Sequence, residues 1–299
     1  MSREGIPVGT MVRGNGGKAP GRLGRLGGRG FECVQIHWWA GLGADDPAET
    51  ARRIEDDPAD GRPGPPVRSL ALYGNPLRRD SEGDEARRSI EALIDSAAVF
   101  GCSIIGLFTG RIPGRPWEDS LPEFTRVFES LAARAADHDV TLALENCPMG
   151  GDDASGDWNL AYSPAAWERL FNALPSRFAD VLGLEWEPAH LIGLGYDPLA
   201  ALDSWKGRIV HVHGKDARAD ADGMVRQTLP GNGSTPWDVI FTVLKRSGYG
   251  GTVDIEGYHD ADWSGDRELD GQQRAAAYLR ACRDGDRSGP RWSAGEDTG

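Results

Sequence analysis

The chain has 299 residues, 39% hydrophobic and 26% charged, which is the composition of a globular protein large enough for one α/β domain. Its formal net charge of -13 argues against a nucleic-acid backbone or an anionic membrane as the main partner, because both carry negative charge themselves. No stretch approaches the roughly 18 apolar residues that cross a membrane, and residues 1–18 lack a signal-peptide core. We therefore expect a cytoplasmic protein.

Eight short segments are predicted to be β-strands, because each is apolar or alternates in polarity and ends near glycine, proline or a charged residue. In chain order they are Ile6–Val12, Glu32–Trp38, Val67–Tyr73, Ser103–Gly110, Val140–Glu145, Val181–Glu187, Ile209–Lys215 and Thr252–Gly257.

Helices are predicted in the intervening segments. They are Pro20–Gly28, Pro47–Ile54, Glu85–Phe100, Pro122–Asp137, Pro164–Leu174, Asp197–Ser204, Pro236–Ser247 and Gly271–Cys282. Ser163-Pro164 and Thr235-Pro236 each place a capping residue before a proline that can begin a helix.

This alternation of strands and helices predicts an α/β protein with a closed (β/α)8 fold, a TIM barrel, in a single domain over residues 1–283. The polar, Gly/Ser-rich segment 284–299 is predicted to be a disordered tail. A doubly wound open sheet is the alternative fold. It would usually carry a glycine-rich phosphate loop, and Gly14-Asn15-Gly16-Gly17 lacks the full dinucleotide spacing.

Polar and apolar residues alternate in the four later strands, TLALEN, LGLEWEPAH, IVHVHGKD and TVDIEGY. Because a strand points alternate side chains to opposite faces, each has an apolar face for the helices and a polar face for the barrel lumen. The polar faces carry Thr141, Glu145, Glu185, Glu187, His211, His213, Lys215, Thr252, Asp254 and Glu256. Branched aliphatic side chains normally fill such a lumen, so these charges need compensation.

One divalent cation would compensate the charged residues at the C-terminal strand ends, where barrel active sites lie. The expected ligands are Glu145, Glu187, His213 and Glu256. Three carboxylates and one imidazole form a hard, oxygen-rich set that suits Mn²⁺, with Mg²⁺ and Co²⁺ as alternatives. Each residue alone could be a solvated or structural group, but four in register on successive strands favour a metal site.

Several short motifs carry a family resemblance. They are Glu145-Asn146, Glu187-Pro-Ala-His190, His211-Val-His213-Gly-Lys215-Asp216, Pro230-Gly231-Asn-Gly233, Gly248-Tyr249 and Asp254-Ile255-Glu256. In order and spacing, across about residues 6–282, they resemble the xylose isomerase-like sugar isomerase/epimerase superfamily. That resemblance implies a TIM barrel with a catalytic divalent metal.

The resemblance also implies residue roles, position by position. Glu145 and Glu256 resemble metal ligands that act as acid and base from opposite sides of the substrate. Glu187 resembles the third carboxylate ligand, His213 the imidazole ligand and His190 a substrate-binding histidine. Many epimerases of the family carry aspartate where this chain has Glu187, and its Glu-x-x-His form is similar to the xylose isomerases proper.

Lys215 and Arg218 are candidate substrate-binding cations. Lys215 would offset the negative charge of an enediolate, or instead form a structural ion pair with Asp216. His211 lies deeper along its strand and is interpreted as a residue behind the ligands or in the core.

His37 and Trp38, followed by Trp39, end the second predicted strand. Aromatic side chains can bind the face of a sugar ring, so His37 and Trp38, the latter taken together with Trp39, are predicted to contact substrate. The alternative is that the tryptophans pack beneath loops.

The expected function is an isomerase or epimerase that transfers a proton next to a carbonyl in a small sugar-like molecule. The alternative on the same barrel is a lyase or dehydratase acting on a keto-sugar, keto-inositol or dehydroshikimate-like substrate. A metal-dependent DNA-repair endonuclease would need more histidine ligands and a basic surface, and the chain has six histidines in all. A non-catalytic sugar-binding subunit is a further alternative, and a homo-oligomer is left open.

Overall fold

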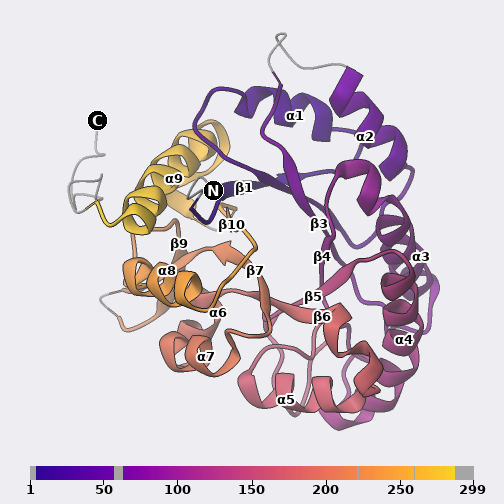
Figure 1. Ribbon diagram of the computed structural model, residues 1–299. Helices are drawn as coiled ribbons and strands as arrows, with labels where there is room; N and C mark the ends of the chain where they lie inside the picture. Colours follow the sequence, from indigo (N-terminus) through magenta and orange to yellow (C-terminus); the bar gives the residue numbers. More distant parts are fainter. Residues whose placement is uncertain (1–4, 57–62, 221, 259, 287–299) are drawn as a thin grey trace.

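The computed structural model describes residues 5–56, 63–220, 222–258 and 260–286, and it shows a closed barrel of eight parallel strands inside a ring of helices (Figure 1). Around the barrel the strands are β1 (Val8–Arg13), β10 (Val253–Ile255), β7 (Ile209–Gly214), β6 (Leu182–Trp186), β5 (Thr141–Glu145), β4 (Ile104–Leu107), β3 (Val67–Tyr73) and β2 (Val34–Trp39). Each strand falls inside a predicted range or extends one residue past its end. The (β/α)8 prediction is confirmed, and the open sheet is wrong because β1 pairs with β10.

The helices that cover the barrel are close to those predicted. They are α1 (Ala19–Leu26), α2 (Pro47–Asp56), α3 (Ser81–Ser96), α4 (Trp117–Asp137), α5 (Pro164–Ala173), α7 (Pro198–Trp205), α8 (Trp237–Arg246) and α9 (Glu268–Asp284). Short 3-10 segments lie at Ala97–Phe100, Ser176–Val181, Ala261–Trp263 and Gly265–Arg267. None of these described helices is long and apolar enough to cross a bilayer.

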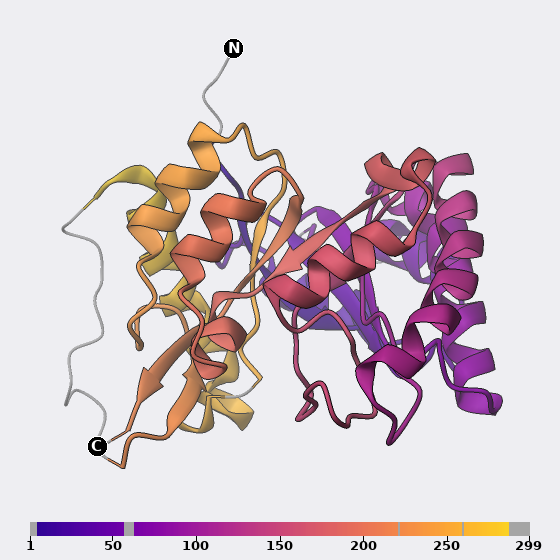
Figure 2. The ribbon, with the colours of Figure 1, turned by 90° about the horizontal axis from the view of Figure 1, so that it is seen from below.

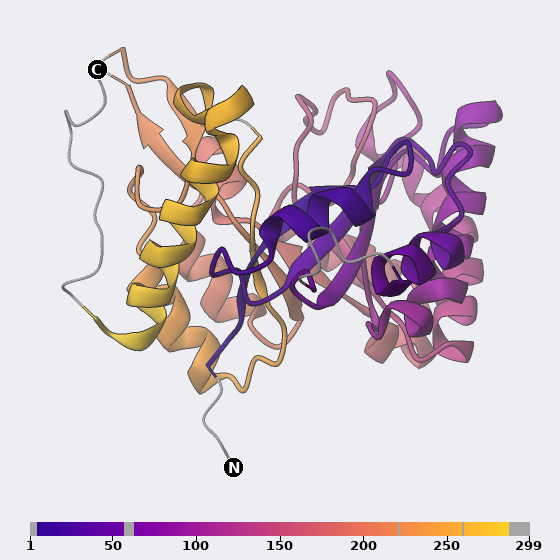
Figure 3. The same cartoon turned by 90° about the horizontal axis from the view of Figure 1, so that it is seen from above.

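Helix α9 completes the ring by packing beside α8 and against β1, as the view from above shows (Figure 3). It ends at Asp284, and Gly285 after it takes the left-handed conformation common at helix ends. Most of the predicted tail, from residue 287 onward, lies outside the described residues, so the tail stays a prediction.

Strand alternation separates the core from the lumen. In β2, Ile36 and Trp38 belong to the large apolar cluster between strands and helices. Their neighbours Gln35 and His37 point the other way, where Gln35 contacts Glu185 on β6 and His37 contacts Tyr258 after β10. The same rule places the polar residues of β5, β6, β7 and β10 inside the barrel.

Of the two predicted helix caps, the one at Ser163 forms and the one at Thr235 does not. The hydroxyl of Ser163 accepts a hydrogen bond from the backbone N–H of Ala166 at 3.3 Å and caps α5. Thr235 does not cap α8, whose N-cap position is Pro236. Instead, the Thr235 backbone N–H donates to Oδ1 of Asp216 at 2.8 Å, which ties the segment before α8 to the chain just after β7.

Two elements near the C-terminal strand ends were not predicted. Helix α6 (Pro188–Gly193) follows β6, and an antiparallel hairpin of β8 (Asp216–Ala219) and β9 (Val225–Thr228) follows β7. In Figure 2 this hairpin, in orange, projects from the same end of the barrel as the long loops that follow β4 and β5. These segments form the rim above the lumen.

Three loops of that rim are tied together by Arg111, a fully buried residue after β4. Its guanidinium donates to the carbonyl oxygens of Arg115 at 2.9 Å and Asp153 at 3.4 Å, so it joins the loop after β4 to the loop after β5. Asn75, after β3, donates to the carbonyl oxygens of Arg111 and Asp157, each at 2.6 Å.

Candidate metal centre

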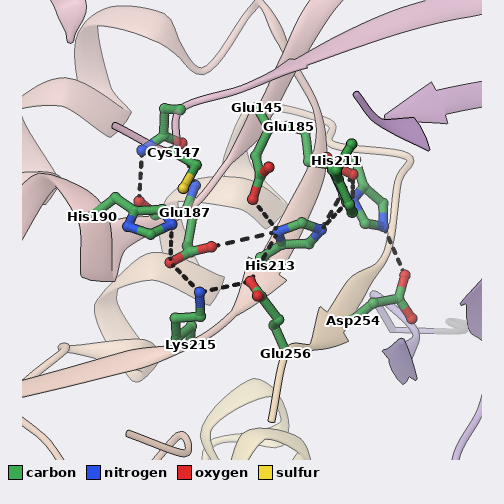
Figure 4. A network of polar contacts seen from close by, with 12 residues as sticks. Glu145, Cys147, Glu185, Glu187, His190, His211, His213, Lys215, Asp254 and Glu256 are labelled. Carbon is green, nitrogen blue, oxygen red and sulfur yellow. Dashed lines mark hydrogen bonds and ion pairs between the residues drawn. The ribbon is translucent and has the colours of Figure 1, made fainter. Parts of the chain in front are cut away.

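The four predicted metal ligands converge at the C-terminal end of the lumen (Figure 4). Glu145 ends β5, Glu187 follows β6, His213 lies on β7 and Glu256 follows β10. One ligand atom from each lies within 4.8 Å of the others. Nδ1 of His213 is 3.2 Å from Oε1 of Glu145, 3.5 Å from Oε2 of Glu187 and 3.7 Å from Oε2 of Glu256.

A divalent cation fits this set because several of its buried atoms make no well-aligned hydrogen bond. Among the described residues, these atoms include both carboxylate oxygens of Glu187 and Nδ1 of His213. Within the described chain, the Glu187 carboxylate has ion-pair contacts instead, 3.1 Å from Nε2 of His190, 3.1 Å from Nζ of Lys215 and 3.5 Å from Nδ1 of His213. Buried carboxylates in this state are costly, and metal coordination would satisfy them.

The close approach of these groups shifts their titration. Burial raises the pKa of Glu145 to about 8, although the hydrogen bond and charge of His213 act in the opposite direction. Burial would lower the pKa of His213, but the surrounding carboxylates, Glu185 foremost, hold it well above the usual value. Burial would raise the pKa of Glu187, but the charges of His190 and Lys215 keep it well below the usual range.

Lys215 belongs to this centre. Its buried ammonium lies 2.7 Å from Oε2 of Glu256 as well as 3.1 Å from Glu187. Asp216 turns the other way and accepts hydrogen bonds from the backbone N–H groups of Ala217 and Thr235, each at 2.8 Å. Within the described residues, Lys215 is therefore paired with two of the candidate ligands, and the alternative of a Lys215–Asp216 ion pair is wrong.

His190 lies on α6, three residues after Glu187, and is 6% exposed. Nε2 of His190 contacts Glu187, and Nδ1 lies 3.0 Å from the amide nitrogen of Gln227 on β9. The unpredicted hairpin thus supplies a contact that orients the predicted histidine.

A second, deeper polar group lies beneath the four ligands. The ring of His211 lies between two buried carboxylates, with Nδ1 2.8 Å from Oε1 of Glu185 and Nε2 2.7 Å from Oδ2 of Asp254. Burial opposes protonation of His211, but its hydrogen bonds to Asp254 and Glu185 outweigh burial and raise its pKa. Gln35 and Tyr73 complete the group from β2 and β3. Neither residue was predicted to belong to the site, although strand alternation places both in the lumen.

A cavity of about 310 Å³ opens above the ligands. Its polar lining consists of Glu145, Glu256, Lys215, His190 and Gln227. Its other lining residues are Trp39, Tyr73, Phe108, Cys147 and Pro148–Gly150. The rings of Trp39 and Phe108 meet edge to face with centroids 6.1 Å apart. The cavity is therefore lined by both charged groups and aromatic rings.

The remaining predicted substrate contacts have mixed positions. His37 is buried in the lumen wall, where Nε2 lies 3.1 Å from the hydroxyl of Tyr258, and burial lowers its pKa to about 3. Trp38 is fully buried on the helix side of β2 and donates to Oδ2 of Asp45 at 3.1 Å, so its predicted substrate contact is wrong. The neighbouring Trp39 lines the cavity instead. Arg218 lies on β8, 3.3 Å from Asn232, and is not among the cavity-lining residues described.

Residues 25–282 match the family described as xylose isomerase-like TIM barrel. The chain belongs to this family.

The chain is also similar in sequence to individual proteins. The chain is 26% identical over 223 residues to an uncharacterized protein, YfiH, of Bacillus subtilis, a match that covers 63% of this chain and 70% of that protein. It is 32% identical over 91 residues to an inosose dehydratase of Clostridium beijerinckii, covering 26% of this chain. The match spans about a third of the dehydratase, 30% of its length.

A similar fold occurs in the crystal structure of 3-keto-D-glucoside 4-epimerase, YcjR, from E. coli. The TM-score is 0.67 at 18% identity, and the superposition covers 93% of this chain and all of the epimerase. At this identity the similarity shows the shared barrel. The proteins to which the chain is similar thus include a dehydratase, by sequence over part of its length, and an epimerase, by fold.

Proposed function

We propose that the protein is a divalent-metal-dependent isomerase or epimerase that moves a proton next to a carbonyl group of a sugar or related polyol. One observation carries this proposal. Glu145 and Glu256 come from β5 and from the end of β10, border the same cavity and share one candidate metal centre. Two carboxylates so placed can act on one carbon from different sides.

A divalent ion held by Glu145, Glu187, His213 and Glu256 would polarise the substrate carbonyl and acidify the adjacent C–H bond. Three carboxylates and one imidazole suit Mn²⁺ or Mg²⁺ best. One of the two cavity-facing carboxylates then removes the proton from carbon, and the other returns a proton to the opposite face.

Other side chains of the cavity would bind and orient the substrate. The Lys215 ammonium lies beside Glu256 and offsets negative charge that develops on the substrate oxygens. His190 and Gln227 offer hydrogen-bonding groups in the lining of the same cavity. Trp39, which is 45% exposed, presents an aromatic face to the apolar C–H groups of a sugar or cyclitol.

A dehydratase is the second candidate, and the position of Lys215 favours it. A departing hydroxyl carries developing negative charge, and the Lys215 ammonium, 2.7 Å from a carboxylate, is a cation within the cavity that can stabilise it. Proton abstraction next to the carbonyl would be common to both reactions. They differ in whether a hydroxyl leaves from the neighbouring carbon.

Incubation of Mn²⁺- or Mg²⁺-loaded protein with free sugars, keto-sugars and cyclitols in D₂O, followed by NMR, tests the proposal. Deuterium at the carbon next to the carbonyl, with a new stereoisomer or ketose, supports the isomerase or epimerase. Release of water with a new unsaturated ketone identifies the dehydratase. Metal-loaded protein that exchanges no carbon-bound proton in any of these substrates contradicts both.

A further inference from the structure

The two rings of β7 that point into the lumen belong to one continuous polar chain. His213 has its Nδ1 on the cavity side, facing the candidate ligands Glu145 and Glu187. Its other nitrogen, Nε2, faces the barrel interior and lies 3.2 Å from Oε1 of Glu185. Glu185 in turn contacts His211 at 2.8 Å. The metal centre and the deeper group therefore meet at the His213 ring (Figure 4).

The deeper group differs from the metal centre in its hydrogen bonding. Glu185 is fully buried, and its Oε1 accepts from the Gln35 amide at 2.6 Å while its Oε2 accepts from the Tyr73 hydroxyl at 3.0 Å. Among the described residues, buried atoms without a hydrogen bond include Nδ1 of His213 and both oxygens of Glu187, but none of Glu185 or His211. Although Glu185, His211 and His213 are close enough to share an ion, this group is already satisfied by protein atoms.

Glu185 also determines which end of Gln35 faces His213. The Gln35 amide nitrogen must point to the carboxylate, 2.6 Å away, which turns its oxygen toward Nε2 of His213 at 3.1 Å. Nε2 thus faces two acceptor oxygens and, at 3.3 Å, the Tyr73 hydroxyl, which donates its own proton to Glu185. This arrangement favours a proton on Nε2, so that an incoming metal displaces the proton on Nδ1 and the Nδ1 lone pair then faces the ion.

The barrel wall leaves room for this carboxylate. Gly106 on β4 faces Glu185, and a Cβ at that position would lie 2.3 Å from Oε1 and 2.6 Å from Oε2 of Glu185. Any residue larger than glycine would have to displace the carboxylate from its contacts with His213 and Gln35.

We propose that Glu185 is a positioning residue that holds the His213 ring with its proton on Nε2 and its Nδ1 available to a divalent metal. This rests on the proposed function, because it assumes that His213 is a metal ligand. Carboxylate partners of this kind typically alter metal affinity by about 10–100-fold. Glu185 itself touches neither the cavity nor, by this arrangement, the substrate.

Metal titration of the full chain by calorimetry, with Mn²⁺ and Mg²⁺, tests the proposal. Glu185→Gln keeps the size of the side chain but removes its charge, and should weaken metal binding by about 10–100-fold. Gly106→Ala should weaken binding in the same direction by displacing the carboxylate. Ser69→Ala is the matched control, because Ser69 is equally buried and contacts His211 at 3.3 Å but not Glu185 or His213. It should leave metal affinity nearly unchanged.

A spectroscopic measurement on the unsubstituted protein makes the test independent of whether the variants fold. In the Co²⁺-loaded protein, proton NMR in H₂O should show one hyperfine-shifted imidazole N–H signal that is absent in D₂O and in His213→Ala. In folded Glu185→Gln this signal should move and exchange faster with solvent.

Unchanged metal affinity in Glu185→Gln, equal losses in Glu185→Gln and Ser69→Ala, or no protected N–H signal in the Co²⁺ protein would each overturn the role of Glu185. Failure of the unsubstituted protein to bind any of these ions would instead overturn the proposed metal-dependent function. The two failures are therefore distinguishable.

Discussion

Glu145 and Glu256 are each expected to hold a metal and to move a proton, and glutamine separates these tasks. It is nearly isosteric and offers a carbonyl oxygen, but it cannot accept a proton. Glu145→Gln and Glu256→Gln should each lower kcat by about 10²–10⁴-fold. Circular dichroism should show little change in fold.

The two glutamine variants also distinguish the reaction classes. In an isomerase or epimerase, one variant should still exchange the substrate proton with D₂O without turnover. In a dehydratase that uses a single base, the two variants should differ strongly in rate. Near-normal turnover in both would leave these residues as ligands without a proton-transfer role.

Trp38 and Trp39 are adjacent residues with opposite environments and form a matched pair. Trp39 is 45% exposed and lines the cavity, so Trp39→Ala should raise KM for the substrate with little loss of stability. Trp38 is fully buried among core residues, so Trp38→Ala should lower the free energy of unfolding by about 3–5 kcal/mol. Steady-state kinetics and denaturant unfolding measure both effects. An unchanged KM in Trp39→Ala would exclude the substrate contact.

Strand alternation explains which residues of the centre could be predicted. It separates Glu145, His213 and Glu256 from their apolar neighbours, and the structure brings these three together with Glu187. The same alternation, applied to Gln35 and His37, would have placed Trp39 rather than Trp38 in the lumen. Contacts between strands distant in sequence, such as Tyr73 with Glu185, depend on barrel closure and leave no local pattern.

At the level of single elements, the start of α5 gives a direct comparison of caps. The Ser163 hydroxyl accepts from the backbone N–H of Ala166, so Ser163→Ala should lower the free energy of unfolding by about 1 kcal/mol. Thr235 also precedes a proline but does not cap α8, so Thr235→Ala should cost less. Urea denaturation of both variants measures the difference. A larger loss in Thr235→Ala would contradict this assignment of the caps.

The β8–β9 hairpin shows where local sequence reasoning fails. Its residues, DARADADGMVRQT, alternate alanine with charged residues in the first half and lack the large apolar side chains of the barrel strands, because the hairpin covers the rim of the site rather than the core. Its base is fixed by long-range contacts, in which Asp216 accepts from Gly231 and Thr235. Helix α6 has only six residues and begins at Pro188, so it is too short to carry a helical repeat.

For the whole molecule, the raised pKa of Glu145 predicts how metal binding depends on pH. Below about pH 8 the metal-free carboxyl carries a proton that an incoming ion must displace. The raised pKa of His213 acts in the same direction. Metal affinity should therefore rise as pH increases toward about 8 and then level off, with proton release on binding. Calorimetry in several buffers measures the metal affinity and the number of protons released. A constant affinity across this pH range would contradict the raised pKa values of Glu145 and His213.

The same shift has the opposite effect on the metal-free fold. Because the pKa of Glu145 is higher in the folded protein than its ordinary value of 4.5, the folded state binds more protons than the unfolded chain between these values. Stability of the metal-free protein should thus fall as pH rises toward about 8. Bound metal should reduce this loss.

The barrel could be predicted because it depends on features that repeat along the chain. Eight apolar strands separated by amphipathic helices specify a parallel sheet, and their number allows closure. The order of strands then follows the sequence, with β10 returning to β1. The exact reach of each helix was less predictable, since α4 begins at Trp117, five residues before the expected Pro122.

The buried guanidinium of Arg111 has a kinetic consequence for access to the cavity. Because it bonds backbone carbonyls of the loops after β4 and β5, and Asn75 joins the loop after β3 to both, none of the three loops can move outward without exposing these polar groups. Opening of this part of the rim is therefore a single cooperative event. The hairpin takes no part in this linkage among the described contacts, and is tied instead to His190 through Gln227.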